Sequence, residues 1–156
     1  MQYGIDNEPK ALTWLQRNCG AKLVEQAGER TFLHQSGMLA ATPDAITTNG
    51  YVVEVKCPET KFIFDRRCGQ LTHTSTGSNA EVIEMYGDQI QAEMACTGLD
   101  NALLVFYHKE QSGDEHGFVM HVKRDDEWFE KNKSKFKRAI AMQRGRTGLT
   151  NPTVVW

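Results

Sequence analysis

The fold is decided by the stretch from Thr42 to Pro58, which reads Thr-Pro-Asp-Ala-Ile-Thr-Thr-Asn-Gly-Tyr-Val-Val-Glu-Val-Lys-Cys-Pro. An Asn-Gly turn signal at positions 49 and 50 separates its two halves and predicts a hairpin. This hairpin folds Asp44 toward Glu54 and Lys56, so that two carboxylates and an amine meet at one place. Hard oxygen ligands beside an ammonium are the groups that a hydrolytic Mg²⁺ site needs.

The second half of this stretch has the alternation of a half-buried strand. Side chains of a strand point to opposite faces in turn, so Glu54 and Lys56 share one face. Val53 and Val55 then point to the other face, into a core. Burial of the valines would hold the charged face rigid.

Composition favours one soluble domain spanning residues 1–156, because 156 residues with 40% hydrophobic content can form a core without disulfides. No apolar run approaches the roughly 20 residues that span a bilayer, and the first residues lack a signal-peptide pattern. We therefore expect a cytoplasmic protein with no membrane partner. The four cysteines form no C-x-x-C and the five histidines have no metal-ligand spacing, so neither a zinc site nor an iron–sulfur cluster is indicated.

The charge is unevenly distributed along the chain. A net charge of −2 argues against a small, generally basic nucleic-acid binder, but it does not exclude a local basic surface. A stretch near the C-terminus contains only basic charges: Lys131, Lys133, Lys135, Lys137, Arg138, Arg144 and Arg146. Such a run predicts either a solvated helix face or a DNA-facing surface. Residues 144–156 are expected to form a C-terminal tail, with an apolar end that covers a groove or meets another subunit.

Helical patterns occur in three places. The first predicted helix has Asn7 as its cap, Pro9 in its first turn and Gly20 at its end, which places Glu8 at its N-terminus. The strongest helix follows a Ser78-x-x-Glu81 capping box and ends at Gly98. On it, the polar stripe of Gln89 and Glu93 faces either solvent or a site. A last helix opens at residue 125, and residues 59–72 fit a helix or a loop.

Strand patterns indicate a mixed α/β (α+β) fold. Residues 22–26, 31–35, 38–41 and 51–57 read as an antiparallel meander. The apolar run 101–108 is a central strand, and 117–123 returns beside it. The polar run 72–79 reads as a loop.

Several motifs together carry a resemblance to a known family. Pro43-Asp44 followed by Glu54-x-Lys56 resembles the PD-(D/E)xK nuclease superfamily, although a hairpin can carry these residues by chance as a surface ion pair. Three further matches occur in order: Gly4-x-x-x-Glu8, Glu54-Val55-Lys56-Cys57-Pro58, and Tyr86-Gly87-Asp88-Gln89-Ile90-Gln91 with Met94 and Thr97-Gly98. Together they are similar to the phage lambda exonuclease and YqaJ-type viral recombinase family. The resemblance implies a restriction-endonuclease-like core, a central mixed β-sheet flanked by helices.

The resemblance also implies the chemistry of the site. Asp44 and Glu54 would bind Mg²⁺, or Mn²⁺ in its place, together with the backbone carbonyl of Val55. Glu8 would reach the same cluster and support a second ion, so the site would hold one or two. Lys56 would orient or activate the attacking water; confinement would lower its pKa, and the adjacent carboxylates would oppose that shift. The reaction is in-line attack of water on a phosphodiester.

Further residues are implied to hold the site or the DNA. Gln89 would hold the site from the neighbouring helix. Thr42 occupies the position of a small hydroxyl residue near the terminal phosphate of the DNA. Gln91, Lys135 and Arg138 are expected to contact DNA as well.

The family degrades linear double-stranded DNA from a 5′ end, releases mononucleotides and leaves a 3′ overhang. Its members form rings, typically trimers, and pass the overhang to a single-strand annealing protein for phage-type recombination. The resemblance therefore implies these partners and a bacterial cell, phage-infected or prophage-bearing. One departure is expected to matter: the N-terminal segment that binds the 5′-phosphate in the family is absent from this sequence.

Other functions remain open from the sequence. A restriction-type or repair endonuclease would share the Asp, Glu and Lys of the motif. A CRISPR-adaptation nuclease with an iron–sulfur cluster is disfavoured by the cysteine spacing. A catalytically inactive DNA-binding assembly module is disfavoured by intact Asp44, Glu54 and Lys56, because buried carboxylates are costly.

Overall fold

A computed structural model describes residues 2–24, 27–72, 80–147 and 153–155. In this part of the chain, a four-stranded sheet has the order β3-β4-β5-β6. The strands are β3 (Ala45–Ile46), β4 (Tyr51–Lys56), β5 (Asn101–Lys109) and β6 (Glu115–Lys123). β4 and β5 are parallel, while the other neighbours are antiparallel. The central mixed sheet predicted from the sequence is confirmed, with the apolar β5 inside it.

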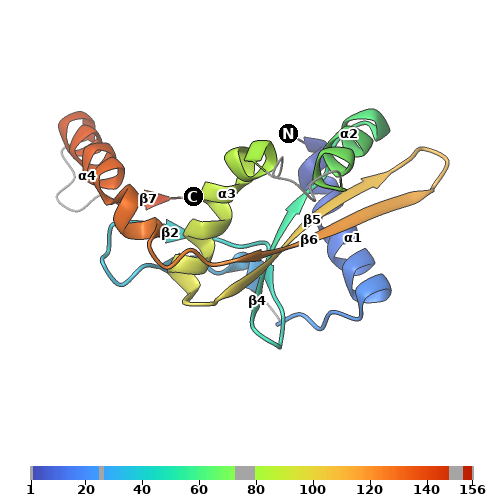
Figure 1. Cartoon of the computed structure of the whole chain (residues 1–156), viewed down its shortest axis with the longest axis horizontal. Helices are drawn as coiled ribbons and strands as arrows, with labels where there is room; N and C mark the ends of the chain where they lie inside the picture. Colours follow the sequence, from blue (N-terminus) through green and yellow to red (C-terminus); the bar gives the residue numbers. More distant parts are fainter. Residues whose placement is uncertain (1, 25–26, 73–79, 148–152, 156) are drawn as a thin grey trace.

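Helices cover both faces of this sheet (Figure 1). Ala11 and Leu15 of α1 (Gln2–Cys19) pack against Val53 and Val55 on one face. On the other face, α2 (Lys61–Thr72) and α3 (Ala80–Thr97) pack against the side chains that alternate with these valines. The valines of β4 therefore point toward α1, as predicted, and Glu54 shares its face of the sheet with the α3 side.

A second, three-stranded sheet lies on the far side of α3. It has the order β1-β2-β7, from β1 (Phe32–Leu33), β2 (Leu39–Ala41) and β7 (Val154–Val155). The helix α4 (Trp128–Thr147) packs here around Leu39 and Ala92, at the opposite end of the molecule from α2 (Figure 1). α3 thus packs both against the four-stranded sheet and against the three-stranded sheet with α4. No described helix is long and apolar enough to cross a membrane.

The predicted start of the first helix is wrong. α1 begins at Gln2, and Pro9 lies inside it. Asn7 does not cap the helix, because its side-chain amide donates to the Tyr3 carbonyl at 2.8 Å within an existing turn. The predicted end is confirmed by Gly20, which has φ +67°. Glu8 consequently lies in the middle of a helix and not at its N-terminus.

The predicted four-strand meander is also wrong. In the described part of residues 22–26, pairing is limited to an isolated bridge from Leu23 to Thr47, and residues 25–26 lie outside the described residues. β1 and β2 pair with each other but join the second sheet. The 3₁₀ turn Ala27–Glu29 precedes β1. There Gly28 approaches the Asp44 carbonyl so closely that a Cβ would lie 2.3 Å from it. Hydrophobic alternation carries no information about such a contact.

The remaining elements mostly follow the sequence. Residues Lys61–Thr72 form a helix, and α3 ends before Gly98 at φ +73°. Ser78 of the predicted capping box and most of the predicted 72–79 loop lie outside the described residues. α4 starts at Trp128, three residues later than predicted, because Asp125 accepts the Glu127 backbone N–H at 2.9 Å and forms the turn before the helix. The predicted tail is shorter, since α4 reaches Thr147 and Val154 pairs with Leu39 of β2.

Candidate active site

The carboxyl end of β4 carries an ion pair between a buried acid and a half-buried lysine, and the pair faces α3. Glu54 is only 3% exposed, and Lys56 Nζ donates to its Oε1 at 2.5 Å. Gln89 of α3 joins both residues: its Oε1 accepts from Lys56 Nζ at 3.0 Å, and its Nε2 donates to Glu54 Oε1 at 2.7 Å. The structure therefore brings together three of the residues singled out in the sequence.

Asp44 reaches the same place from the connection before β3. Its Oδ2 accepts the Val55 backbone N–H at 2.6 Å, so its carboxylate lies beside β4 one residue from Glu54. The Gly28 turn packs against the Asp44 backbone and leaves no room for a side chain there. The hairpin predicted through Asn49-Gly50 does form, with Ala45 paired to Val53.

Glu8 approaches the cluster from α1. Burial raises the pKa of Glu8, and the charge of Glu54 raises it further, while Lys56 opposes the shift. Glu8 is thus close enough to the pair on β4 to feel both charges. Its place inside α1 brings it there, because α1 packs directly on the Val55 side of the sheet.

Sequence reasoning left one member of the cluster undecided. Glu93 is fully buried, and its Oε1 accepts from Gln89 Nε2 at 3.1 Å. An acid one helical turn after Gln89, in an otherwise apolar part of α3, was the available signal. The polar stripe of α3, formed by Gln89 and Glu93, therefore faces the site and not solvent. We call the residues Glu8, Asp44, Glu54, Lys56, Gln89 and Glu93 the Glu54 cluster.

Burial and crowded acids shift the pKa values of this cluster. Burial and then Glu54 raise the pKa of Asp44 to about 7, although the Val55 N–H opposes the shift. Burial and Glu54 raise the pKa of Glu93 to about 10. Burial lowers the pKa of Lys56, but Glu54 and the other acids outweigh it and hold the net pKa above its usual value. At Lys56 the effect of the neighbouring acids on the pKa exceeds that of burial, so the side chain is an ammonium at neutral pH.

The cluster has more acceptors than donors. Glu54 Oε2 and Glu93 Oε2 are buried without a hydrogen-bond partner within the described residues. Buried carboxyl oxygens without partners are costly unless a proton or a cation binds them. The raised pKa of Glu93 favours a proton on that acid, whereas ionised hard oxygens fit Mg²⁺ or Mn²⁺. Across the described ranges, no three Asp, Glu, His or Cys side chains converge as a preformed metal-binding group. The predicted set instead consists of two carboxylates and a main-chain carbonyl, with Glu8 beside them.

A family model described as the YqaJ-like viral recombinase domain matches residues 1–100, which include every residue of the Glu54 cluster. The chain belongs to the YqaJ-like viral recombinase domain family. This confirms the resemblance drawn from the sequence motifs. No curated protein matches the chain in sequence.

Solved structures share the fold of this YqaJ-like domain. The crystal structure of an alkaline exonuclease (LHK-Exo) from Laribacter hongkongensis has a TM-score of 0.71 and 21% identity, covering 94% of this chain and 69% of that one. The same enzyme in complex with dAMP gives a TM-score of 0.67 and 20% identity over 94% and 69%. A phage-related exonuclease from Haemophilus somnus 129PT gives 0.65 and 15% over 88% and 67%. The restriction-endonuclease-like fold predicted from the sequence is thereby confirmed.

The residues predicted to contact DNA lie apart from one another in the YqaJ-like domain. Thr42 lies two residues before Asp44, and its hydroxyl is 2.9 Å from the Thr31 hydroxyl. The Gln91 amide bridges the Lys123 carbonyl at 2.9 Å and the Asp125 N–H at 2.8 Å, on the side of α3 away from Gln89. Lys135 and Arg138 are exposed on α4. Thr42 and Gln91 are each two residues from a member of the Glu54 cluster, whereas Lys135 and Arg138 are far from it along the chain.

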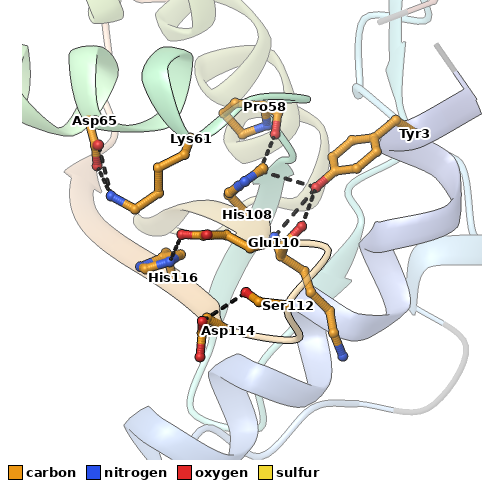
Figure 2. A network of polar contacts seen from close by, with 10 residues as sticks. Tyr3, Pro58, Lys61, Asp65, His108, Glu110, Ser112, Asp114 and His116 are labelled. Carbon is orange, nitrogen blue, oxygen red and sulfur yellow. Dashed lines mark hydrogen bonds and ion pairs between the residues drawn. The ribbon is translucent and has the colours of Figure 1, made fainter.

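A second polar group fixes the chain just beyond the cluster. His108 of β5 is buried, and its Nδ1 lies 2.9 Å from the Pro58 carbonyl and 3.1 Å from the Tyr3 hydroxyl (Figure 2). Since a carbonyl only accepts, His108 carries its proton on Nδ1. His116 Nε2 contacts Glu110 Oε1 at 2.7 Å in the same network. We call Tyr3, Pro58, His108, Glu110 and His116 the His108 network. It ties the end of the Glu-Val-Lys-Cys-Pro motif to α1 and β5.

Proposed function

We propose that the chain is a metal-dependent exodeoxyribonuclease that degrades linear double-stranded DNA in the 5′ to 3′ direction and leaves a 3′ overhang. The observation that carries the proposal is the Glu54 cluster itself. In a member of the YqaJ-like family, Asp44, Glu54, Lys56 and Gln89 meet at the end of β4 with buried oxygens left without partners. The structural relatives from Laribacter hongkongensis and Haemophilus somnus are exonucleases, in agreement with this proposal.

Asp44, Glu54 and the Val55 carbonyl are the groups that would hold Mg²⁺ or Mn²⁺, with Glu8 available for a second ion. When bound, the metal supplies Lewis-acid stabilisation of the phosphate and of the oxygens that attack and leave. The Val55 N–H holds Asp44 beside Glu54 through its 2.6 Å hydrogen bond, so both acids could bind the same metal ion. This preorganisation avoids rearrangement during the reaction.

Lys56 acts as a hydrogen-bond donor in this proposal. Its raised pKa keeps the proton on Nζ, so it orients the attacking water or a phosphate oxygen by donating to it. Gln89 Oε1 and Glu54 Oε1 hold the ammonium from two sides, and the Tyr86 ring centroid lies 5.1 Å from Nζ. Activation of water by an uncharged Lys56, the alternative in the sequence analysis, is disfavoured by these contacts.

The wider assignments belong to the same proposal. We infer one nuclease domain for residues 1–156, acting in a ring-shaped homotrimer and supplying 3′ overhangs to a single-strand annealing protein. The exposed Lys135 and Arg138 of α4 give a subunit of net charge −2 a local basic surface for DNA. Thr42, beside the Asp44 connection, would lie near the terminal phosphate.

The test uses 5′-phosphorylated linear duplex labelled at either end, next to a covalently closed circle. With Mg²⁺, we expect mononucleotide release from the linear form only, with the 5′ label released before the 3′ label, and no release in EDTA. Lys56→Ala should lower the rate by roughly 10²–10³-fold, the loss expected for one aligned charge-stabilising donor. Lys22→Ala, an exposed lysine, is the matched control and should retain the rate. Equal cleavage of the circle would instead assign an endonuclease, and no cleavage of either substrate would overturn the proposal.

A further inference from the structure

Gln89 is the connecting residue of the Glu54 cluster. Its Nε2 donates to Glu54 Oε1 at 2.7 Å and to Glu93 Oε1 at 3.1 Å, while its Oε1 accepts from Lys56 Nζ at 3.0 Å. Both the nitrogen and the oxygen of the Gln89 side-chain amide therefore make hydrogen bonds within the cluster. The position of the Lys56 ammonium depends on which way round this amide lies.

The neighbours of Gln89 dictate that orientation. A carboxylate oxygen accepts and an ammonium only donates, so the amide must present its NH₂ group to Glu54 and its oxygen to Lys56. Glu54 Oε1 also accepts from Lys56 at 2.5 Å, so one oxygen serves both groups. A second acceptor for the NH₂ group is required to use both of its protons, and Glu93 supplies it.

Glu93 is well placed for this task. It lies one helical turn after Gln89 on α3, so the helix fixes the spacing between the two side chains. It is fully buried, where water cannot replace its oxygen. A buried acid beside other acids is costly. The cost indicates a role that packing does not explain.

We propose that Glu93 is a positioning residue that fixes the orientation of the Gln89 amide and, through it, the Lys56 ammonium. Glu93 has no contact with substrate in this role. The part concerning Lys56 rests on the nuclease function proposed above, whereas the part concerning Gln89 is a property of the protein without metal or DNA.

The first experiment uses metal-free protein and side-chain amide NMR of Gln89, with signals assigned by comparison with Gln89→Ala. Glu93→Leu should shift the Gln89 NH₂ signals and accelerate their exchange with water, because one proton loses its acceptor. Glu93→Gln keeps an acceptor oxygen at the same place and should restore signals close to those of the wild type. Unchanged Gln89 signals in Glu93→Leu would overturn the proposal whether or not the chain is a nuclease.

The second experiment measures mononucleotide release on linear duplex in a double-mutant cycle. Glu93→Leu should lower kcat roughly tenfold, the value of about one hydrogen bond, with KM for DNA unchanged. In a Gln89→Ala background, the same substitution should have no further effect, because the amide it positions is gone. Additive losses, or failure of Glu93→Gln to recover kcat, would overturn the proposal.

A matched control separates positioning from stability. Asp88 lies on the same helix but accepts from Trp128 Nε1 at 2.8 Å, on the α4 side. Asp88→Leu should lower the melting temperature and leave kcat and the Gln89 signals unchanged at 25 °C. If wild-type protein shows no nuclease activity, the NMR result still decides the proposal for Gln89.

Discussion

Two polar groups lie on neighbouring strands of the same sheet, the Glu54 cluster on β4 and the His108 network on β5 and β6, and they are built on opposite principles. In the His108 network, donors match acceptors: His108 contacts Pro58 at 2.9 Å, and Glu110 contacts His116 at 2.7 Å. In the Glu54 cluster, the acids outnumber the single ammonium, and two buried oxygens have no partner in the described part of the chain. A matched network stabilises a fold, whereas an excess of buried acceptors fits a cation-binding site.

The difference predicts opposite responses to neutral substitutions. Removing a partner from the His108 network should destabilise the protein and spare the chemistry. Neutralising an acid proposed to bind the metal, such as Asp44, should abolish the chemistry and stabilise the metal-free protein. Natural active sites commonly trade stability for function in this way.

The largest effect is expected for Asp44→Asn. The substitution removes a proposed metal ligand, so mononucleotide release should fall by at least about 10²–10³-fold. Burial and Glu54 raise the pKa of Asp44 to about 7, so its ionised form is unfavourable at pH 8 without metal. Asparagine keeps an acceptor for the Val55 N–H, and the melting temperature in EDTA at pH 8 should rise by roughly 2 °C or more.

Asp65→Asn serves as the control for Asp44→Asn. Asp65 is an exposed acid that pairs with Lys61 on α2 at 2.8 Å. Both the rate and the melting temperature should stay close to the wild-type values, because exposed ion pairs contribute little. Wild-type activity in Asp44→Asn would contradict the role assigned to the cluster.

The smallest effect is expected for Tyr3→Phe in the His108 network. The Tyr3 hydroxyl lies 3.1 Å from His108 Nδ1 and donates to the Lys109 carbonyl at 3.2 Å. Its loss should lower the free energy of unfolding by about 1 kcal/mol, and the melting temperature by roughly 2–4 °C. The rate at 25 °C should not change. Tyr51→Phe is the control, because Tyr51 lies at the start of β4 and outside the His108 network. A large loss of rate in Tyr3→Phe would show that the two groups are coupled.

The sequence predicted most of the Glu54 cluster because several of its residues are close together in the chain. Asp44, Glu54 and Lys56 lie within one hairpin, so strand alternation and a turn signal bring them together. Gln89 and Glu8 required the family resemblance, since no periodicity relates them to β4. Glu93 remained ambiguous because a polar residue on a helix faces either solvent or a site, and only the packing of α3 between two cores decides which.

The errors in the fold have a similar cause. Alternation predicted strands in the region before Asp44, but long-range contacts determined their pairing, including the close approach of Gly28 to Asp44 and the joining of Val154 to β2. The start of α1 was misplaced because Asn7 and Pro9 resemble a helix start locally, while Tyr3 anchors an earlier turn through Lys109 and His108. Local signals therefore predicted which residues meet in the Glu54 cluster better than they predicted the topology.

The most direct test of the account is the melting temperature between pH 5 and 8.5, in EDTA and in Mg²⁺. The pKa values of Asp44 and Glu93 are raised to about 7 and about 10, above those of the unfolded chain, so both acids stabilise the metal-free fold only while protonated. In EDTA, the stability they contribute should decline as the pH rises through about 7 and on toward 10. A bound cation favours the ionised acids, so Mg²⁺ should add little at pH 5 and much more at pH 8.5, with the gain lost in Glu54→Gln. Equal melting temperatures with and without Mg²⁺ at pH 8.5 would contradict a cation site in the Glu54 cluster.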